Sequence, residues 1–401
     1  MLLEMVLFLL AGMATGILAG LIPGIHTNLI GAILVSGTLS LLIGINPIYL
    51  VIFIVAMSIS QVFIDFIPSI FLGAPEDGTE LSVLPGHEML KEGEGLKAAN
   101  LAFIGGLGGI FLFFLLIPPL YFGSKIIGNL PGIVIALGLM GVSLNMILSE
   151  QKKASAILTF ILSGALGLTA SGLEINEPLL PLLTGLFGSA GLFFSINQKT
   201  KVEKQKDDEG SIQEGIKESK RALVWSAMFS PLSLFLPALS SGQIAIVSNQ
   251  FAKSEKKQFL LMLGAITMLS MCLSFLGLFL ISKTRTGSAA AIMSLVGTPD
   301  LKTFILISIT ILISGVLSFL IAKKVSKKFI ATLEKVDYSK VSIATIILIG
   351  IVTFFVSGIL GLVILAMSTA TGIYCIKLGV KRTNMMGSLI LPTILFYLKM
   401  A

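Results

Sequence analysis

Long apolar runs, separated by short polar connections, constrain this chain more than any other feature of its sequence. A helix needs about 20 apolar residues to cross the hydrocarbon core of a bilayer. Hydrophobic residues make up 55% of the 401 residues and charged residues only 12%, so a water-soluble core could not bury the apolar surface. The runs lie at 2–22, 25–45, 47–72, 98–122, 130–148, 154–172, 178–196, 222–238, 240–252, 258–281, 286–297, 301–322, 341–358, 359–376 and 384–400.

The runs indicate helices rather than the strands of a barrel. They lack the alternation of apolar and polar residues that a barrel strand shows, and a helix satisfies its own backbone groups in lipid. The first run carries Glu4 as its only early charge, so we interpret it as a membrane segment and not as a signal peptide. Because several runs are too short to cross alone, we expect an all-α, polytopic integral membrane protein with about 10–12 membrane segments.

Charge and motif content exclude several other classes of protein. The net charge of +7 is spread over short clusters, without the basic face and interleaved aromatic residues of a nucleic-acid-binding protein. Cys272 and Cys375 both lie in apolar runs and indicate neither a disulfide framework nor a metal site. The sequence has no Walker-type phosphate loop and no HExxH motif. We therefore expect no cofactor and no resident metal, apart from a coupling ion.

One hydrophilic stretch divides the membrane part into two halves. Residues 199–221 contain seven Lys or Arg and six Asp or Glu residues. Further basic clusters indicate cytoplasmic connections, because cytoplasmic loops are enriched in Lys and Arg; they lie at 152–153, 253–257, 323–340 and 377–382. We predict a first membrane repeat at 1–198, a cytoplasmic charged linker at 199–221 and a second membrane repeat at 222–401.

The two halves share a pattern of interrupted runs. The first half breaks at 17–30, ILAGLIPGIHTNLI, and at 71–87, FLGAPEDGTELSVLPGH. The second half breaks at 234–247, LFLPALSSGQIAIV, and at 283–299, KTRTGSAAAIMSLVGTP. Paired interruptions in corresponding places are typical of transporter binding sites. The alternative is that Pro and Gly are simply common in membrane helices.

The first break contains Pro23 and Gly24, which cannot continue an ideal helix. The residues that follow would begin a half-helix, whose free N–H groups and positive dipole suit an anion. We expect Gly24, Thr27 and Asn28 to bind substrate, with His26 as a further candidate anion ligand. Alternatively, His26 and Asn28 only form hydrogen bonds between helices.

Asp65 lies within the apolar run 47–72. A carboxylate at this depth is costly and usually faces a cavity or a partner. We therefore expect Asp65 to bind a coupling cation or to carry a proton. The alternative is a segment bent at Pro68 that places Asp65 near the membrane interface.

The break after this run, GAPEDG at 73–78, is densely polar. Carboxylates and hydroxyls suit Na⁺, because hard cations prefer oxygen ligands. We expect Glu76 and Asp77 to take part in ion coupling, and Gly73 and Thr79 to line the substrate site. A solvated surface loop is the alternative.

The second half offers two further groups of polar residues. After Pro237 we expect the substrate to meet Ser241, Gly242 and Gln243. Arg285 begins a short Ala-rich segment, and a guanidinium pairs well with a carboxylate. With Lys283, however, Arg285 would also suit a cytoplasmic anchor. The cluster GGLGG at 105–109 favours close packing of helices over a nucleotide loop.

Three segments resemble the large permease subunit of the tripartite tricarboxylate transporters. GILAGLIPGIHTN at 16–28 resembles the first signature of that family, a Gly-rich helix that reaches Pro-Gly. LGAPEDGTELSVLPGHEMLKEGEGLKA at 72–98 resembles its second signature, although Pro85 stands where the family has Asp and His26 replaces a small residue of the first. Residues 377–391, with Gly379 and Gly387, resemble the closing segment, and the chain is shorter than typical members.

The resemblance implies two inverted repeats with re-entrant hairpins that meet near the midplane of the membrane. It also implies secondary uptake of an organic anion, driven by an ion gradient. Family members usually work with an extracytoplasmic binding protein and a small membrane subunit. We thus expect those two proteins, membrane lipid and a small organic anion as partners, and a homo-oligomer would be compatible with the sequence.

These features favour a multi-pass secondary transporter of the cytoplasmic membrane that moves a carboxylate-type anion, coupled to Na⁺ or H⁺. Rocking of the two repeats would give alternating access. An alternative is a translocator of a phosphate-headed lipid carrier such as a polyprenyl phosphate, which would use the same half-helix ends. An intramembrane enzyme would need two of His26, Asp65 and His87 close together. We expect no enzyme, and a membrane scaffold would leave the paired breaks unexplained.

Overall fold

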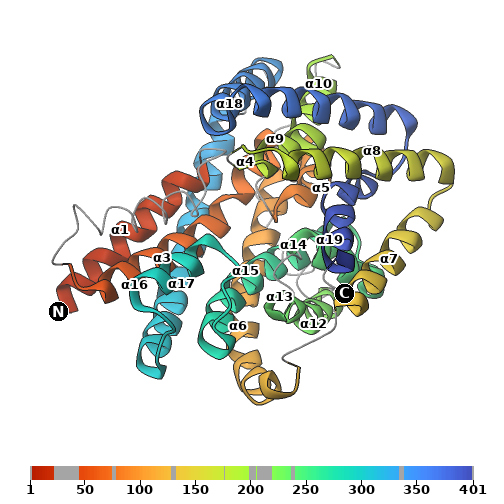
Figure 1. The fold of residues 1–401 in the computed structure, drawn as a ribbon. Coiled ribbons are helices and arrows are strands. Elements are labelled where there is room, and N and C mark those ends of the chain that lie inside the picture. Colours follow the sequence, from red (N-terminus) through yellow and green to blue (C-terminus); the bar gives the residue numbers. More distant parts are fainter. Residues whose placement is uncertain are drawn as a thin grey trace. The chain divides into compact units, whose positions relative to one another are not determined.

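Every regular element in the described part of the chain is helical (Figure 1). The computed structural model describes residues 2–21, 45–74, 78–127, 132–175, 177–197, 205, 219–235, 240–333 and 338–399. Within these residues, seven helices are long and apolar enough to cross a membrane. The prediction of an all-α polytopic membrane protein is therefore confirmed. The predicted run 25–45 lies almost wholly outside the described residues.

The helices follow the apolar runs closely. Up to residue 197 they are α1 (Leu2–Leu21), α3 (Pro47–Ile64), α4 (Phe66–Leu72), η1 (Glu80–Ser82), α5 (Val83–Lys91), α6 (Gly95–Ile127), α7 (Gly132–Leu148), α8 (Lys153–Gly172), α9 (Leu179–Leu183), the π-helix η2 (Thr184–Ser189) and α10 (Ala190–Asn197). From residue 220 they are α12 (Lys220–Phe229), α13 (Leu232–Phe235), α14 (Ser241–Ala252), α15 (Lys256–Ile281), α16 (Gly287–Val296), α17 (Leu301–Leu333), α18 (Tyr338–Leu378), η3 (Arg382–Met386) and α19 (Gly387–Lys399).

The helices form two compact units, each built from separate stretches of the chain. Unit 1 comprises Met1–Ile67, Ala99–Gly128 and Asp208–Lys327. Unit 2 comprises Pro68–Ala98, Asn129–Asp207 and Lys328–Ala401. Each unit therefore draws on both halves of the sequence. The two units are defined by how compactly their residues pack, whereas the repeats predicted at 1–198 and 222–401 are consecutive stretches of sequence. The repeats therefore stay a prediction.

In unit 1, α1 packs against α3 along glycines spaced four residues apart (Figure 1). A Cβ atom on Gly12 would overlap the carbonyl oxygen of Phe53, and one on Gly16 would overlap that of Met57. Gly20 continues the stripe and faces Ile64. Small residues at this spacing let two helix backbones approach closely, which favours association in lipid.

A second close approach joins α6 and α15. A Cβ on Gly105 would overlap the carbonyl oxygen of Leu261, and one on Gly264 would overlap that of Ala102. Gly109 lies on the same face, with a Cβ position 2.7 Å from the carbonyl oxygen of Ala265. The interpretation of the GGLGG cluster as a helix-packing surface is therefore confirmed.

In unit 2, α19 packs against α7 and α8, and α18 packs against η2 and α10. Glycines again allow the contacts, since a Cβ on Gly167 would overlap the main chain of Ser388. Within α18, Gly358 has φ 68° and ψ −163°, so two helices meet there. The sequence places a boundary between the runs 341–358 and 359–376, and the structure confirms it. The run 178–196 is not a regular α-helix, because η2 interrupts it with π geometry.

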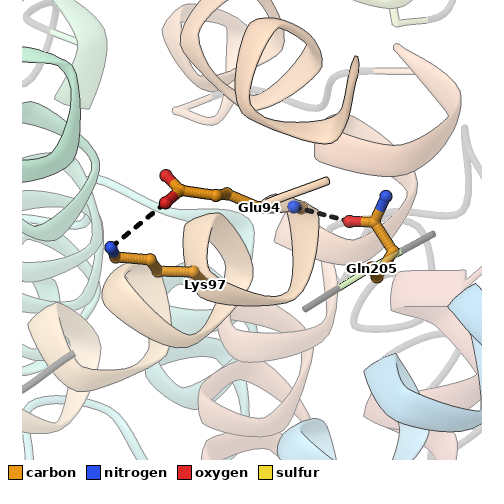
Figure 2. A network of polar contacts seen from close by, with 4 residues as sticks. Glu94, Lys97 and Gln205 are labelled. Atoms are coloured by element: carbon orange, nitrogen blue, oxygen red, sulfur yellow. Dashed lines mark hydrogen bonds and ion pairs between the residues drawn. The ribbon is translucent and has the colours of Figure 1, made fainter. Parts of the chain in front are cut away.

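Hydrogen bonds of the Gln205 side chain stabilise the junction between α5 and α6 in unit 2 (Figure 2). The main chain leaves α5 through Gly93, which has φ 78°. The Gln205 side chain accepts a hydrogen bond from the Gly95 N–H at 2.7 Å and donates to the Leu90 carbonyl oxygen at 3.0 Å, and Glu94 forms an ion pair with Lys97 at 3.5 Å. A residue of the charged linker therefore bonds to main-chain groups at the end of one helix and the start of the next.

The glycine contact between α1 and α3 predicts the effect of adding a single methyl group. We expect Gly16→Ala to destabilise the protein, because the new Cβ would meet main-chain atoms of α3, which cannot rotate away. Overpacking of this kind costs about 1–3 kcal/mol. The thermal unfolding midpoint in detergent should therefore fall.

A matched variant controls for the loss of glycine in a membrane helix. Gly138→Ala adds the same methyl group to α7, where a Cβ meets nothing within 4 Å. It should leave the midpoint nearly unchanged. Equal midpoints for the two variants would contradict the packing of α1 on α3.

Candidate functional site

The predicted site residues fall into three groups in the structure. Asp65 and Arg285 lie in unit 1 together with Ser241, Gly242 and Gln243. Gly73 and Thr79 lie in unit 2. The remaining predicted ligands lie outside the described residues: Gly24, His26, Thr27, Asn28, Glu76 and Asp77. Each unit therefore contributes part of the predicted set.

Asp65 occupies the break between α3 and α4. Its N–H still donates to the Gln61 carbonyl oxygen at 2.9 Å, so α3 ends in a regular turn. The side chain is buried, and Asp65 Oδ1 lies 3.0 Å from the position of a Cβ on Gly20. Glycine at position 20 thus leaves room for the carboxylate beside the last turn of α1. The break predicted at Pro23 follows in the sequence and lies outside the described residues.

Asp65 belongs to a buried polar face of α3. Ser58, Gln61 and Asp65 are spaced three and four residues apart, which puts them on one side of the helix. They are 0%, 4% and 8% exposed. A polar face inside a membrane protein marks a partner or a pathway, so this side of α3 is the best candidate for ion coupling in unit 1.

The polar face of α3 reaches the start of α16. The Ser58 hydroxyl donates to Ser288 Oγ at 2.7 Å. Thr286 caps α16 by accepting from the Ala289 N–H at 3.2 Å, and its hydroxyl lies 2.9 Å from that of Ser274. The predicted break at 283–299 therefore includes a true helix start. Arg285 directly precedes this cap and is half-buried.

The start of α14 carries a buried amide donor. Ser240 Oγ accepts from the Gln243 N–H at 3.1 Å, and Gln243 Oε1 accepts from the Ser240 N–H at 2.8 Å, which forms a capping box. Gln243 is 1% exposed, and its Nε2 has no hydrogen-bond partner among the described residues. A buried donor at a helix N-terminus suits an anion. The binding role expected of Ser241, Gly242 and Gln243 stays a prediction.

In unit 2, the described part of the break at 73–79 folds back onto α4. The Ser69 hydroxyl donates to the Thr79 carbonyl oxygen at 3.1 Å and lies 2.9 Å from Ser82 Oγ. The Gly78 N–H donates to Glu80 Oε2 at 2.6 Å. Thr79 and Glu80 are each 1% exposed. Thr79 and Glu80 are therefore buried in protein, whereas residues of a solvated surface loop would be exposed.

At Gly73 the main chain adopts a left-handed turn in which a side chain would be both strained and obstructed. Its φ is 65°, and a Cβ there would lie 2.5 Å from Nε2 of His87. His87 is buried and hydrogen-bonds to the main chain of Ile70. Burial, with the positive charges of Arg382 and Lys91, lowers the pKa of His87 to about 3. His87 is therefore neutral at physiological pH.

The structure adds Arg382, which the sequence analysis placed in a basic cytoplasmic cluster. Its Nη1 donates to the Phe187 carbonyl oxygen in η2 at 3.3 Å. A Cβ on Gly191 would lie 3.3 Å from the same nitrogen, so the guanidinium rests on the start of α10. The sequence does single out Arg382 in one way, because most of its 28 basic residues are lysines and three are arginines. These are Arg221, Arg285 and Arg382. Such sparing use favours a specific bonding role.

The lowered pKa of His87 predicts a stability that depends on pH. An unfolded histidine binds a proton below a pH of about 6.5. The folded protein resists protonation until about pH 3, so the contribution of His87 is complete above its unfolded pKa and is lost as the pH falls. The slope can reach about 1.4 kcal/mol per pH unit.

His87→Gln isolates this contribution, because glutamine keeps a hydrogen-bond donor and does not titrate. Thermal unfolding of wild type and variant in detergent, from about pH 7 to about pH 5, should give a steeper loss of midpoint for the wild type. Parallel curves would contradict the buried, neutral state of His87.

Comparison with known proteins adds a relationship over nearly the whole chain. Residues 6–387 match the family model described as "Tripartite tricarboxylate transporter TctA family". A protein of Methanocaldococcus jannaschii, described as uncharacterized, is 28% identical over 404 residues, which cover 98% of this chain and 99% of the relative. No solved structure matches the chain.

Proposed function

Because the chain belongs to the tripartite tricarboxylate transporter TctA family, we propose that it is a secondary active transporter of a small carboxylate-type anion, coupled to Na⁺ or H⁺. The match over residues 6–387 carries the proposal, because it takes in every candidate site described above. The family is one of transporters, and the seven membrane-length helices make this chain a multi-pass membrane protein.

The half-helix starts support the choice of an anion. Gln243 brings a buried amide donor to the first turn of α14, where the helix dipole also favours negative charge. Ser241 and Gly242 add N–H groups of the same turn. In this proposal, Gly24, Thr27 and Asn28 play the corresponding part in the first half of the chain, with His26 beside them. Arg285 is a further candidate ligand for a carboxylate.

The buried carboxylate of Asp65 supports coupling to a cation. The carboxylate is buried on the polar face of α3, against Gly20. Burial of a carboxylate in a membrane protein is costly, and such groups usually mark ion or proton pathways. In this proposal, Asp65 binds Na⁺ or carries a proton, and Glu76 and Asp77 assist. The turn at Gly73 and the buried Thr79 contribute to the substrate site from unit 2.

The tripartite systems of this family include a binding protein and a small membrane subunit. For this chain we propose the same partners. A binding protein would deliver the anion to the outer side of the membrane, and the chain itself would provide the path across it.

Uptake by purified protein tests the function directly. Proteoliposomes loaded with unlabelled substrate should take up labelled di- or tricarboxylate by counterflow. An inward gradient of Na⁺ or H⁺ should increase the accumulation. Absence of uptake for every carboxylate, with and without a binding protein, would overturn the proposal.

Asp65→Asn tests the coupling step. The amide cannot hold a proton or a full negative charge, so gradient-driven accumulation should fall to the level seen without a gradient. Counterflow exchange should persist, because the substrate ligands remain. The measurement is labelled uptake with and without an imposed gradient of Na⁺ or pH.

Asp300→Asn is the matched control, since it removes the same charge from an exposed carboxylate that precedes α17. Asp300 Oδ1 accepts from the Thr303 N–H at 2.8 Å, and an asparagine can cap the helix in the same way. This variant should couple normally. Unchanged coupling in Asp65→Asn would remove Asp65 from the mechanism.

A further inference from the structure

Unit 1 contains three buried serines whose hydroxyls are not used by the protein itself. Ser230 ends α12, Ser233 lies in α13 and Ser270 lies in the middle of α15. They are 0%, 0% and 4% exposed, and their hydroxyls form no hydrogen bond among the described residues. A buried polar group without a partner requires an explanation, such as a bound water or ligand.

Neighbouring hydroxyls on the same helices behave differently. On α12, Ser226 Oγ donates to the Ala222 carbonyl oxygen at 2.8 Å. On α15, Thr267 Oγ1 donates to the main chain of its preceding turn at 2.9 Å. A serine or threonine inside a helix often satisfies its hydroxyl in this way. Ser230 and Ser270 lie about one turn further along and lack such a bond, so their hydroxyls remain available to a ligand.

The serines of α12 and α13 lie on the side of these helices that faces the interior of unit 1. Ser226, Ser230 and Ser233 are spaced four and three residues apart, which puts them on one side. All three are fully buried, whereas Val224 and Met228 on the other side are exposed. Both α12 and α13 pack against α14 and α15 (Figure 1). The hydroxyls of Ser230 and Ser233 are therefore enclosed by those helices.

The direction of α12 places Ser230 toward the start of α14. The guanidinium of Arg221, in the first turn of α12, donates to the Phe251 carbonyl oxygen in the last turn of α14 at 2.8 Å. The two helices have similar lengths, 10 and 12 residues, and pack against each other. They therefore run antiparallel, and the end of α12 lies beside the start of α14.

Ser270 lies on α15 between the contacts of this helix with α13 and with α16. Gly277 is on the same face, and a Cβ there would lie 3.3 Å from Leu234 Cδ1 of α13. Ser274, one turn after Ser270, has its hydroxyl 2.9 Å from that of Thr286, which caps α16. A short connection joins α14 to α15, and the two pack as a helical hairpin. The middle of α15 is therefore level with the start of α14.

The start of α14 supplies a further buried donor. The Oε1 atom of Gln243 is used in the capping box with Ser240, whereas Nε2 has no partner among the described residues and the side chain is 1% exposed. The free N–H groups of the first turn and the helix dipole favour negative charge at the same place. Three hydroxyls and one amide from four helical elements thus surround the start of α14.

The distribution of charge also favours an anion. Among the described residues from α12 to α16, the one carboxylate is Glu255, which precedes α15 about 22 Å along the helix from Ser270. On α3, Asp65 lies two turns, about 10 Å, from Ser58, the residue that bonds to α16. Arg285 is half-buried and directly precedes α16. A bound anion would therefore meet donors at the start of α14, with a cation one helix away.

We propose that Ser230, Ser233 and Ser270 are substrate ligands that, together with Gln243, bind a carboxylate group of the transported anion at the start of α14. A carboxylate can accept about four hydrogen bonds, and three hydroxyls and an amide can donate them. These donors are neutral, so recognition here uses hydrogen bonds rather than ion pairs. The choice of a carboxylate rests on the proposed function. The site itself rests on the buried groups that the protein leaves without partners.

Direct binding tests the site without relying on transport. The full-length protein in phosphatidylcholine nanodiscs is titrated by calorimetry with citrate, succinate and acetate. Ser270→Ala and Ser233→Ala each remove one donor, and each should weaken binding about tenfold, as expected for a hydrogen bond to a charged group. Neither hydroxyl has a partner in the ligand-free protein, so the thermal unfolding midpoint without ligand should stay unchanged or rise slightly.

Ser226→Ala is the matched control. It removes a hydroxyl from the same side of α12, but one that is already bonded to Ala222. It should bind the acids like the wild type. Gln243→Glu keeps the acceptor of the capping box, because glutamate is common at this position, and it replaces the free donor with a negative charge. It should bind more weakly than either Ser270→Ala or Ser233→Ala.

Three outcomes contradict the inference. They are a wild type that binds none of the three acids, variants Ser270→Ala and Ser233→Ala that bind like the wild type, as expected if water alone occupies the site, and a Ser226→Ala variant as weak as these two. Transport in proteoliposomes is scored separately. Carboxylate uptake that is unchanged in both serine variants removes this site alone. Binding that depends on Ser270 and Ser233, without any uptake, removes the proposed transport alone.

Discussion

A main-chain N–H or C=O group in a bilayer has no water to bond, so a helix can be interrupted only where protein surrounds the interruption. The architecture depends on this constraint. In unit 1, the glycines of α1 and α6 bring helix backbones into direct contact with α3 and α15. At Gly73 the chain turns sharply, and Thr79 and Glu80 beyond it are buried. At the starts of α14 and α16 the free N–H groups are capped by Ser240 and Thr286.

The same constraint explains where polar side chains are found. Asp65 lies against a glycine rather than against lipid, and Ser58 bonds to a hydroxyl on α16. In unit 2, Arg382 bonds to a carbonyl oxygen of a π-helix. Each of these groups is placed where a neighbouring element supplies space or a bonding partner.

The sequence predicts much of the fold because the membrane fixes the length and composition of each helix. The runs predicted at 154–172 and 258–281, which correspond to α8 and α15, and the boundary at Gly358 need no tertiary information. The packing role of Gly105 and Gly109 follows from residue size alone. The interleaving of the chain between the two units could not be predicted, since it depends on contacts between distant segments. Arg382 was missed for the same reason, because a basic residue after a helix resembles a loop anchor until its partner in η2 is known.

The contact between Gly73 and His87 constrains how this protein can change over time. The left-handed turn at Gly73 and the imidazole against it each exclude a side chain at position 73, for two independent reasons. A smaller residue at position 87 would remove only the steric reason. Relatives in which position 73 is no longer glycine should therefore also differ in the course of the main chain around that turn, and in the residue at 87. The dependence therefore runs one way: loss of the glycine requires a change at position 87, whereas a change at position 87 leaves a turn that still favours glycine.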